Sequence, residues 1–207
     1  MSTPTLIDNS DNQRIATWVR NTAETQIEMT LNLDGSGKSS IDTGHAFLDH
    51  MLTLLTLHGS FDLTLKAVGD LEVDAHHTVE DVAIVLGELI RIALGDKIGI
   101  TRYGHAYIPM DETLTRVVID LGNRPYLTFI AAEDTPSPAN LPFSLVEEFF
   151  RALSNHLRSN IHAEVFYGRD GHHIVESLFK SLARALRVAV HQDPFMQGKL
   201  PSTKELL

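Results

Sequence analysis

The sequence predicts an α/β (α+β) sandwich built from two copies of a strands-helix-strand-helix unit. Segments in which apolar and polar residues alternate predict half-buried strands, and longer segments with apolar residues at helical spacing predict helices. These segments follow one another in the same order twice along 207 residues. Because strands that alternate with helices pack in layers, we expect each pair of helices to cover one face of a sheet. We assign residues 1–95 to the first half and residues 96–207 to the second half with a C-terminal tail, in one compact duplicated domain.

The first half contains two expected strands and two expected helices. Apolar residues alternate with polar residues over residues 25–33 and again over residues 61–67, which is the two-residue period of a strand. Helical spacing of the apolar residues predicts helices over residues 47–58 and 76–94. A glycine follows each helix directly, and we expect Gly59 to end the first helix in a left-handed cap.

The second half repeats this order. We expect strands over residues 117–119 and 126–131, and a third strand over residues 161–167, where apolar residues alternate with polar ones. Helices are expected over residues 144–157 and 172–190, because their apolar residues lie on one side of each helix. The same unit is therefore expected to fold twice within one chain.

The composition excludes several classes of site and partner. The chain has 27 acidic residues against 17 Lys and Arg, with a formal net charge of -10, which argues against binding nucleic acid by neutralising its phosphates. It contains no cysteine, which excludes disulfides and thiolate metal ligands. No apolar stretch approaches the roughly 18 to 20 residues of a membrane helix. We therefore expect a cytoplasmic protein without nucleic-acid or membrane partners. Its 11 histidines direct the search to metal binding.

A histidine motif is repeated in the two halves. The sequence HHTVE at residues 76–80 recurs as HHIVE at residues 172–176, and each copy opens the long helix of its half. A polar pair near the start of each shorter helix precedes the motif, at residues 49–50 and 147–148. A single pair of histidines near a helix start is more often a hydrogen-bonded surface or interface feature. Two copies, each with Glu at the fourth position after the first His, favour a metal site.

The helical geometry of the motif predicts two metal ions rather than one. The first His and the Glu are four residues apart and share a helix face, whereas the second His is turned by about 100° from the first. The simplest solution gives each ion a His and Glu pair from one copy and a single His from the other. Imidazole and carboxylate ligands suit Mn, Fe, Zn or Ni. The first predicted site consists of His50, His77, His172 and Glu176, and the second of His76, Glu80, Glu148 and His173.

Several further motifs identify a family that the chain resembles. They are residues 43–51 (TGHAFLDHM), 69–71 (GDL), 76–81 (HHTVED), 102–104 (RYG), 109–112 (PMDE) and 201–204 (PSTK). With these motifs the chain resembles imidazoleglycerol-phosphate dehydratase of histidine biosynthesis from about residue 14 to residue 204. The resemblance implies a duplicated fold like domain 2 of ribosomal protein S5, with two Mn²⁺ ions per chain or other divalent metals in their place. It also implies a homo-oligomer of 24 subunits with active sites between chains.

The resemblance also implies a reaction and the residues that perform it. The substrate is D-erythro-imidazole-glycerol phosphate, which loses water to give imidazole-acetol phosphate. Two metals that flank the imidazole ring can hold it as imidazolate, which helps to expel the neighbouring hydroxyl. Glu24 matches the acid/base glutamate of the family, and Glu80 and Glu176 are further catalytic candidates. The positions that match the phosphate-binding residues of the family are Arg102, Arg124, Lys180, Ser202 and Lys204.

Two other functions remain open from the sequence. A dinuclear metallohydrolase also uses paired metals held by His and carboxylates, in that case to activate water. A metal-bound assembly without catalysis would need the metal ligands but not Glu24, Arg102 or Lys204.

Overall fold

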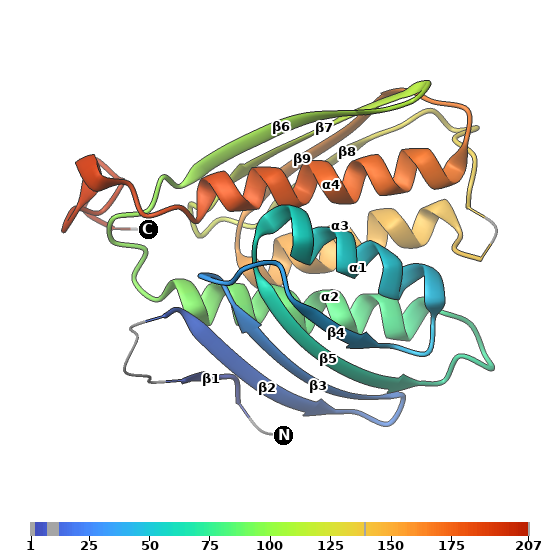
Figure 1. Cartoon of the computed structure of the whole chain (residues 1–207), viewed down its shortest axis with the longest axis horizontal. Helices are drawn as coiled ribbons and strands as arrows, with labels where there is room; N and C mark the ends of the chain where they lie inside the picture. Colours follow the sequence, from blue (N-terminus) through green and yellow to red (C-terminus); the bar gives the residue numbers. More distant parts are fainter. Residues whose placement is uncertain (1–2, 8–12, 139, 207) are drawn as a thin grey trace.

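Two β-sheets enclose a layer of α-helices (Figure 1). This arrangement is seen in a computed structural model, which describes residues 3–7, 13–138 and 140–206. The outer faces of the sheets carry no helix in this part of the chain, and the helices fill the space between the sheets. The predicted sandwich with an internal duplication is therefore confirmed.

Each sheet belongs to one half of the chain, and the two sheets repeat one topology. The first has the strand order β1-β2-β3-β5-β4 and the second the order β6-β7-β9-β8. In each, an antiparallel hairpin (β2-β3 or β6-β7) is extended by an antiparallel strand and then by a parallel one. The strands are β1 (Thr5–Ile7), β2 (Ile15–Asn21), β3 (Thr25–Asn32), β4 (Ser39–Asp42), β5 (Asp62–Gly69), β6 (Tyr103–Met110), β7 (Thr113–Asp120), β8 (Tyr126–Ile130) and β9 (Asn160–Tyr167).

The four helices all begin at the same end of the molecule (Figure 1). They are α1 (Ala46–Gly59), α2 (His76–Leu94), α3 (Phe143–Leu157) and α4 (Gly171–Ala189), followed by a short 3-10 helix η1 (Pro194–Met196). Helices α1 and α2 pack on the first sheet, and α3 and α4 on the second. Between the sheets α1 contacts α4 and α2 contacts α3, so each helix pair covers one sheet face as predicted.

The core lies between the sheets and the helices. The inward side chains of β3 (Ile27, Met29 and Leu31) are each 1% exposed. Between α3 and α4, the rings of Phe149 and Phe179 pack against each other, tilted by 44° with their centroids 4.9 Å apart. Burial of such large apolar groups is the main favourable term in folding, at about 25 cal/mol per Å². This packing fixes the mutual positions of the helix starts, which carry the repeated motif.

Every predicted helix is present, but the predicted end of the first one is wrong. Gly59 is the last residue of α1, and the left-handed residue is Ser60, at φ 56°. A Cβ atom on Gly59 would lie 2.5 Å from the ring of Phe61, so glycine is needed here for close packing rather than as the cap. The N–H of Ser60 instead closes the helix on the carbonyl of Leu57.

Four strands escaped prediction because they are short or lack a regular alternation of buried and exposed side chains. In β2 only Ala16 is fully buried, and in β6 only Gly104 is, so neither strand shows a clear alternation. Strands β1 and β4 are edge strands of three and four residues. The predicted strand over residues 117–119 is the centre of β7, a strand of eight residues. Among the described residues, no helix is both long enough and apolar enough to cross a bilayer.

A buried lysine ties the two halves together just after α2. Lys97 is 2% exposed, and its Nζ donates hydrogen bonds to the Leu121 carbonyl at 2.9 Å and to Asn123 Oδ1 at 2.7 Å. These contacts hold the turn between β7 and β8, in which Arg124 is the next residue. Burial lowers the pKa of Lys97 to about 8, against the partly compensating charge of Asp120.

The free energy of unfolding should depend on the protonation of Lys97 as the pH rises. The pKa of Lys97 is about 8 in the fold and returns to 10.5 in the unfolded chain. Between these values the unfolded chain binds one more proton, so the free energy of unfolding rises with pH, by at most about 3 kcal/mol. Urea unfolding from pH 7 to about 10.5 should therefore show the unaltered chain gaining stability relative to Lys97→Met.

The control for the loss of a lysine charge is Lys66→Met, at an exposed position of β5. Parallel pH profiles for the unaltered chain and Lys97→Met would contradict the assignment of a buried, titrating amine.

Candidate metal centre

The two histidine motifs form the first turns of α2 and α4. An aspartate precedes each: Asp74 accepts a hydrogen bond from the His76 N–H at 2.7 Å, and Asp170 accepts one from the His172 N–H at 2.7 Å. These carboxylates satisfy N–H groups that have no partner inside a helix. Because α2 and α4 begin at the same end of the molecule, both motifs lie there (Figure 1).

The adjacent histidines of each motif face different directions. The ring planes of His76 and His77 are 84° apart with centroids 5.9 Å from each other, and those of His172 and His173 are 83° and 6.4 Å apart. This divergence follows from the rotation of about 100° per residue in a helix. Within a motif the two rings therefore face different surroundings.

Three potential ligands meet where α1 packs on α4. The Nε2 atoms of His50 and His172 lie 3.1 and 3.0 Å from Oε2 of Glu176. The three ligand atoms all lie within 4.8 Å of one another. His172 and Glu176 are one helical turn apart, as the spacing predicted, and His50 comes from α1. In residues 3–7, 13–138 and 140–206 this is the one such group of three or more His, Asp or Glu residues.

The electrostatics of this triad suit a cation. Burial alone would raise the pKa of Glu176, but hydrogen bonds from Lys180, His172 and His50 outweigh it and lower the pKa to about 2. The carboxylate is therefore ionised at neutral pH. A first-row metal ion at about 2.0–2.2 Å from each ligand has neighbouring ligands roughly 3 Å apart, which is the spacing found here. Two imidazole nitrogens and a carboxylate oxygen thus fit a divalent ion.

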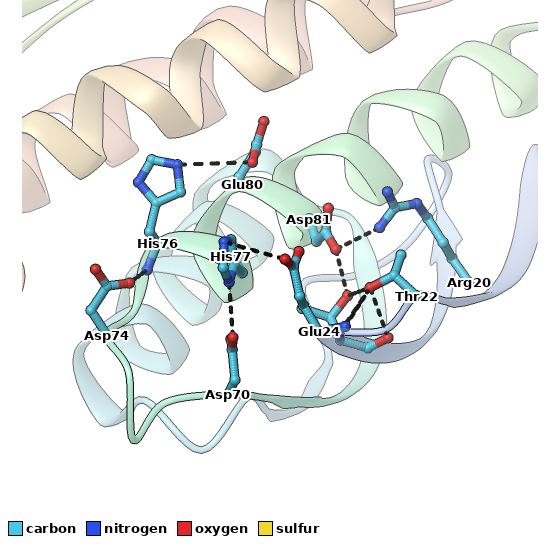
Figure 2. A network of polar contacts seen from close by, with 10 residues as sticks. Arg20, Thr22, Glu24, Asp70, Asp74, His76, His77, Glu80 and Asp81 are labelled. Carbon is cyan, nitrogen blue, oxygen red and sulfur yellow. Dashed lines mark hydrogen bonds and ion pairs between the residues drawn. The ribbon is translucent and has the colours of Figure 1, made fainter.

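The histidines of α2 lie in a separate network, drawn in Figure 2. His76 faces Glu80 one turn later, with Nε2 and Oε2 3.9 Å apart. The His77 ring lies between two carboxylates: its Nδ1 is 2.9 Å from Asp70 Oδ2, and its Nε2 is 3.7 Å from Glu24 Oε1. The Asp70 hydrogen bond raises the pKa of His77.

The second histidine of α4 has similar surroundings. Nδ1 of His173 is 2.9 Å from Glu112 Oε2, and its Nε2 is 3.9 Å from Asp111 Oδ2. Hydrogen bonding to Glu112 raises the pKa of His173, and hydrogen bonds from His173 and from two backbone N–H groups lower the pKa of Glu112. Glu148 on α3 contacts Arg151 Nε at 3.4 Å.

One chain thus brings together three of the eight predicted ligands. His77, which was grouped with the triad, lies outside it, and the four residues of the second predicted site are spread over three places. Neither four-residue set is complete within the described part of a single chain, and both remain proposals.

Most of the predicted phosphate-binding residues lie at the opposite end of the molecule. The Arg102 N–H bonds to the carbonyl of Ala189, the last residue of α4, whereas His172 is the second residue. At 1.5 Å per residue the two places are about 25 Å apart. The Arg102 guanidinium is held by Asp120 through two hydrogen bonds, at 2.7 and 3.2 Å, and by the Pro201 carbonyl.

The remaining members of the phosphate set divide between the two ends. Arg124 lies in the turn after β7 that Lys97 holds, and its carbonyl accepts a hydrogen bond from Asn160. In the tail, the Lys204 N–H donates to Ser202 Oγ at 3.2 Å. Lys180 alone is at the metal end, where its Nζ lies 2.6 Å from Glu176 Oε1.

The turn that carries Glu24 is anchored on α2 (Figure 2). The Thr22 hydroxyl accepts hydrogen bonds from the N–H groups of Glu24 and Thr25 at 3.1 and 2.9 Å, which shapes the turn between β2 and β3. Asp81 of α2, 7% exposed, accepts from the Thr25 hydroxyl and pairs with Arg20 at 2.6 Å. These contacts place an exposed carboxylate beside His77 on a fixed support.

Sequence reasoning missed the carboxylates that contact the histidine rings. Asp70 and Glu112 lie in motifs that carried the family resemblance, but they follow strands in irregular segments where no periodicity predicts a partner. Asp70 precedes its histidine by seven residues, and this proximity was the available signal, whereas Glu112 is 61 residues from His173 in the sequence. His45, one of six histidines left without a role, caps α1 by accepting from the Leu48 N–H.

Comparison with known proteins places these features in context. The family model named imidazoleglycerol-phosphate dehydratase matches residues 43–186. A protein of that name from Akkermansia muciniphila is 63% identical over 195 residues, covering 94% of this chain and 100% of the relative. Another from Heliobacterium modesticaldum is 54% identical over 194 residues, with 94% and 100% coverage.

Two solved structures share the fold. The structure of imidazoleglycerol-phosphate dehydratase from Staphylococcus aureus superposes with a TM-score of 0.77 at 40% identity, covering 86% of this chain and 99% of that one. The enzyme from Pyrococcus furiosus, solved in complex with (S)-C348, superposes with a TM-score of 0.79 at 36% identity, covering 92% and 100%.

Proposed function

The chain belongs to the imidazoleglycerol-phosphate dehydratase family of hydro-lyases, and we propose that it dehydrates D-erythro-imidazole-glycerol phosphate at a pair of divalent metal ions. The observation that carries the metal proposal is the convergence of His50, His172 and Glu176, whose ligand atoms lie within 4.8 Å of one another. An ionised carboxylate beside two imidazoles is a ligand set that suits a divalent ion, which supports the proposal. The repeated motif supplies ligands for a second ion.

The placement of the ligands favours sites shared between copies of the chain. His77 and its partners occupy a cluster apart from the triad, and the second set is divided among α2, α3 and α4. The phosphate-binding residues near Arg102 lie about 25 Å from His172 along α4. A complete site therefore needs more than one chain. This supports the predicted homo-oligomer, for which we retain 24 subunits.

We assign the ligands to two ions. The triad with His77 of a neighbouring copy holds the first, and the four other predicted ligands, His76, Glu80, Glu148 and His173, hold the second. When bound, the two ions would act as Lewis acids that favour the imidazolate form of the substrate ring and fix the ring in place. We favour Mn²⁺, and other divalent ions share the same ligand preferences.

Glu24 supplies the base in this proposal. Its carboxylate is exposed, and its turn is anchored to α2 through Thr25 and Asp81. The carboxylate takes the proton from the substrate carbon, the C–H electron pair forms a C=C bond, and the neighbouring C–O bond breaks. The protonated Glu24 gives its proton to the departing hydroxyl, which leaves as water. The resulting enol becomes the ketone of imidazole-acetol phosphate. Such proton transfer by a positioned side chain contributes typically 10²–10⁴-fold to a rate.

In this proposal, cationic residues from both ends of the folded molecule hold the substrate phosphate. Lys180 lies beside Glu176 and acts as a point charge at the metal end. Arg102, Arg124, Ser202 and Lys204 come from the other end of a neighbouring copy. Because Asp120 already holds one edge of the Arg102 guanidinium, the side chain is fixed before substrate binds.

The predicted cytoplasmic location, and the absence of nucleic-acid and membrane partners, stay predictions.

Replacing Glu24 by Gln tests the base directly. Gln keeps the size of the side chain but cannot accept the proton, so we expect kcat for ketone formation to fall by about 10²–10⁴-fold. The bound Mn²⁺ and the assembly size should stay as in the unaltered protein. An assay of ketone absorbance, metal content and light scattering measures all three.

The matched control is Glu28→Gln, which alters an exposed glutamate of β3, four residues after Glu24 in the sequence. This variant should keep full turnover. Unchanged turnover in Glu24→Gln would remove its role as base. An unaltered protein that forms no ketone would instead favour a metallohydrolase or a non-catalytic metal-bound assembly, for which Glu24 is dispensable.

Glu148 offers a second test with a control beside it. Glu147 and Glu148 both contact Arg151, but Glu148 alone is assigned to a metal. We expect Glu148→Gln to lose one of the two Mn²⁺ ions per chain, because an amide binds a hard cation more weakly than a carboxylate. Glu147→Gln should retain both. Equal metal content in the two variants, measured after dialysis, would remove Glu148 from the ligand set.

Metal removal should dissociate the assembly. If ligands of one ion come from different chains, a chelator breaks the bridges, and the large particle should separate into smaller species. Addition of Mn²⁺ should restore it. Size-exclusion chromatography with light scattering measures the change. An assembly that loses its metal and keeps its size would place each ion within one subunit.

A further inference from the structure

The second histidine of each motif makes the same contact with a carboxylate. Nδ1 of His77 lies 2.9 Å from Asp70 Oδ2, and Nδ1 of His173 lies 2.9 Å from Glu112 Oε2. In both rings the other nitrogen, Nε2, stays outside hydrogen-bond distance of its nearest carboxylate, Glu24 at 3.7 Å or Asp111 at 3.9 Å. One side of each ring is therefore engaged and the other is open.

The two halves reach this contact from different places in the fold. Asp70 directly follows β5, the strand that leads into α2. Glu112 instead lies in the turn between β6 and β7, whose counterpart in the first half is the turn that carries Glu24. The contact is thus not a simple copy of one ancestral residue. Two separate loops supply the same acceptor to the same ring nitrogen, which indicates a requirement of the site itself.

The contact decides which ring nitrogen carries the hydrogen. An ionised carboxylate only accepts hydrogen bonds, so the neutral imidazole must place its hydrogen on Nδ1. The lone pair of Nε2 is then free to bind a metal ion. We propose that Asp70 and Glu112 are positioning residues, which fix the tautomer and the ring orientation of His77 and His173 for metal binding through Nε2. This proposal rests on the proposed metal centre.

The surroundings of both carboxylates fit this role better than a purely structural one. Glu112 is fixed by the N–H groups of Arg169 and Asp170, at 3.0 and 2.9 Å, so its second oxygen is aimed at His173. Asp70 Oδ1 is buried without a hydrogen-bond partner among the described residues. A buried oxygen without a partner costs stability. Asp70 is therefore poorly explained as a stabilising residue.

A general attraction between carboxylates and helix starts is the competing explanation. Two other aspartates of the chain allow this explanation to be tested separately. Asp74 and Asp170 lie at the same two helix starts and cap backbone N–H groups without a hydrogen bond to the His77 or His173 ring. Replacement of either by Asn removes one negative charge near the motif and keeps a good capping residue.

Mn²⁺ affinity tests the proposal. Competition between a chelator and metal-free protein should show two ions per chain in the unaltered protein. We expect Asp70→Asn and Glu112→Gln each to weaken a different one of the two ions, by about 10- to 100-fold. The double variant should weaken both. Asp74→Asn and Asp170→Asn should leave both affinities close to the unaltered values, and all the metal-free variants should unfold at similar temperatures.

The outcomes separate this inference from the metal centre on which it rests. An unaltered protein that binds no Mn²⁺ would overturn the proposed centre. Two ions in the unaltered protein with unchanged affinities in Asp70→Asn and Glu112→Gln would overturn only the positioning role. An equal loss in Asp74→Asn and Asp170→Asn would overturn it too, because charge alone would then account for the effect. A loss matched by unfolding of the metal-free variants would reduce both residues to structural ones.

Discussion

The site depends on one geometric constraint: adjacent side chains on a helix point about 100° apart. The rings of each His pair are turned by 84° and 83°, so neither pair can close on a single ion. In the proposed centre, each motif offers one His to the ion that its own Glu binds and the other His to a different ion. This constraint is the reason for proposing two ions. Within the described part of one chain the two motifs lie in separate clusters, so neither proposed four-ligand set is complete there.

The layered fold places both motifs at one surface of the molecule. All four helices begin at one end of the molecule, where their N-termini favour negative charge (Figure 1). The acidic residues gathered there, which include Asp70, Asp74, Glu112 and Asp170, satisfy helix starts or histidine rings. The carboxylates and imidazoles at this end are ligand types that suit divalent cations. The arginines proposed for phosphate binding sit at the far end of α4, so the two proposed functions are separated within a subunit and, in the proposed enzyme, meet between subunits.

The sequence predicted the helices and the ligand types because both depend on local spacing. Every helix is marked by an apolar stripe, and the distance of four residues between His172 and Glu176 places both on one face. The hairpin strands β2 and β6 were not predictable, since few of their side chains are buried. The meeting of His50 with His172 depends on how α1 packs against α4, and the anchoring of Glu24 on Asp81 depends on a contact 56 residues apart in sequence. Such contacts leave no periodic trace.

The duplication also shows how one ancestral unit produced two unequal halves. The corresponding hairpin turns place Glu24 near Nε2 of His77 and Asp111 near Nε2 of His173, at 3.7 and 3.9 Å. Only the first turn is anchored on its helix through Thr25 and a buried aspartate, whereas Asp111 lies in a tight turn at φ 47° with 81% of its side chain exposed. In the second half, the other residue of the same turn, Glu112, accepts the hydrogen bond from the His173 ring. In the first half Asp70, which follows β5, accepts the corresponding hydrogen bond from the His77 ring, and Glu24 does not. In the proposed mechanism one carboxylate orients a ligand and another moves a proton, and the two halves supply these carboxylates from different turns.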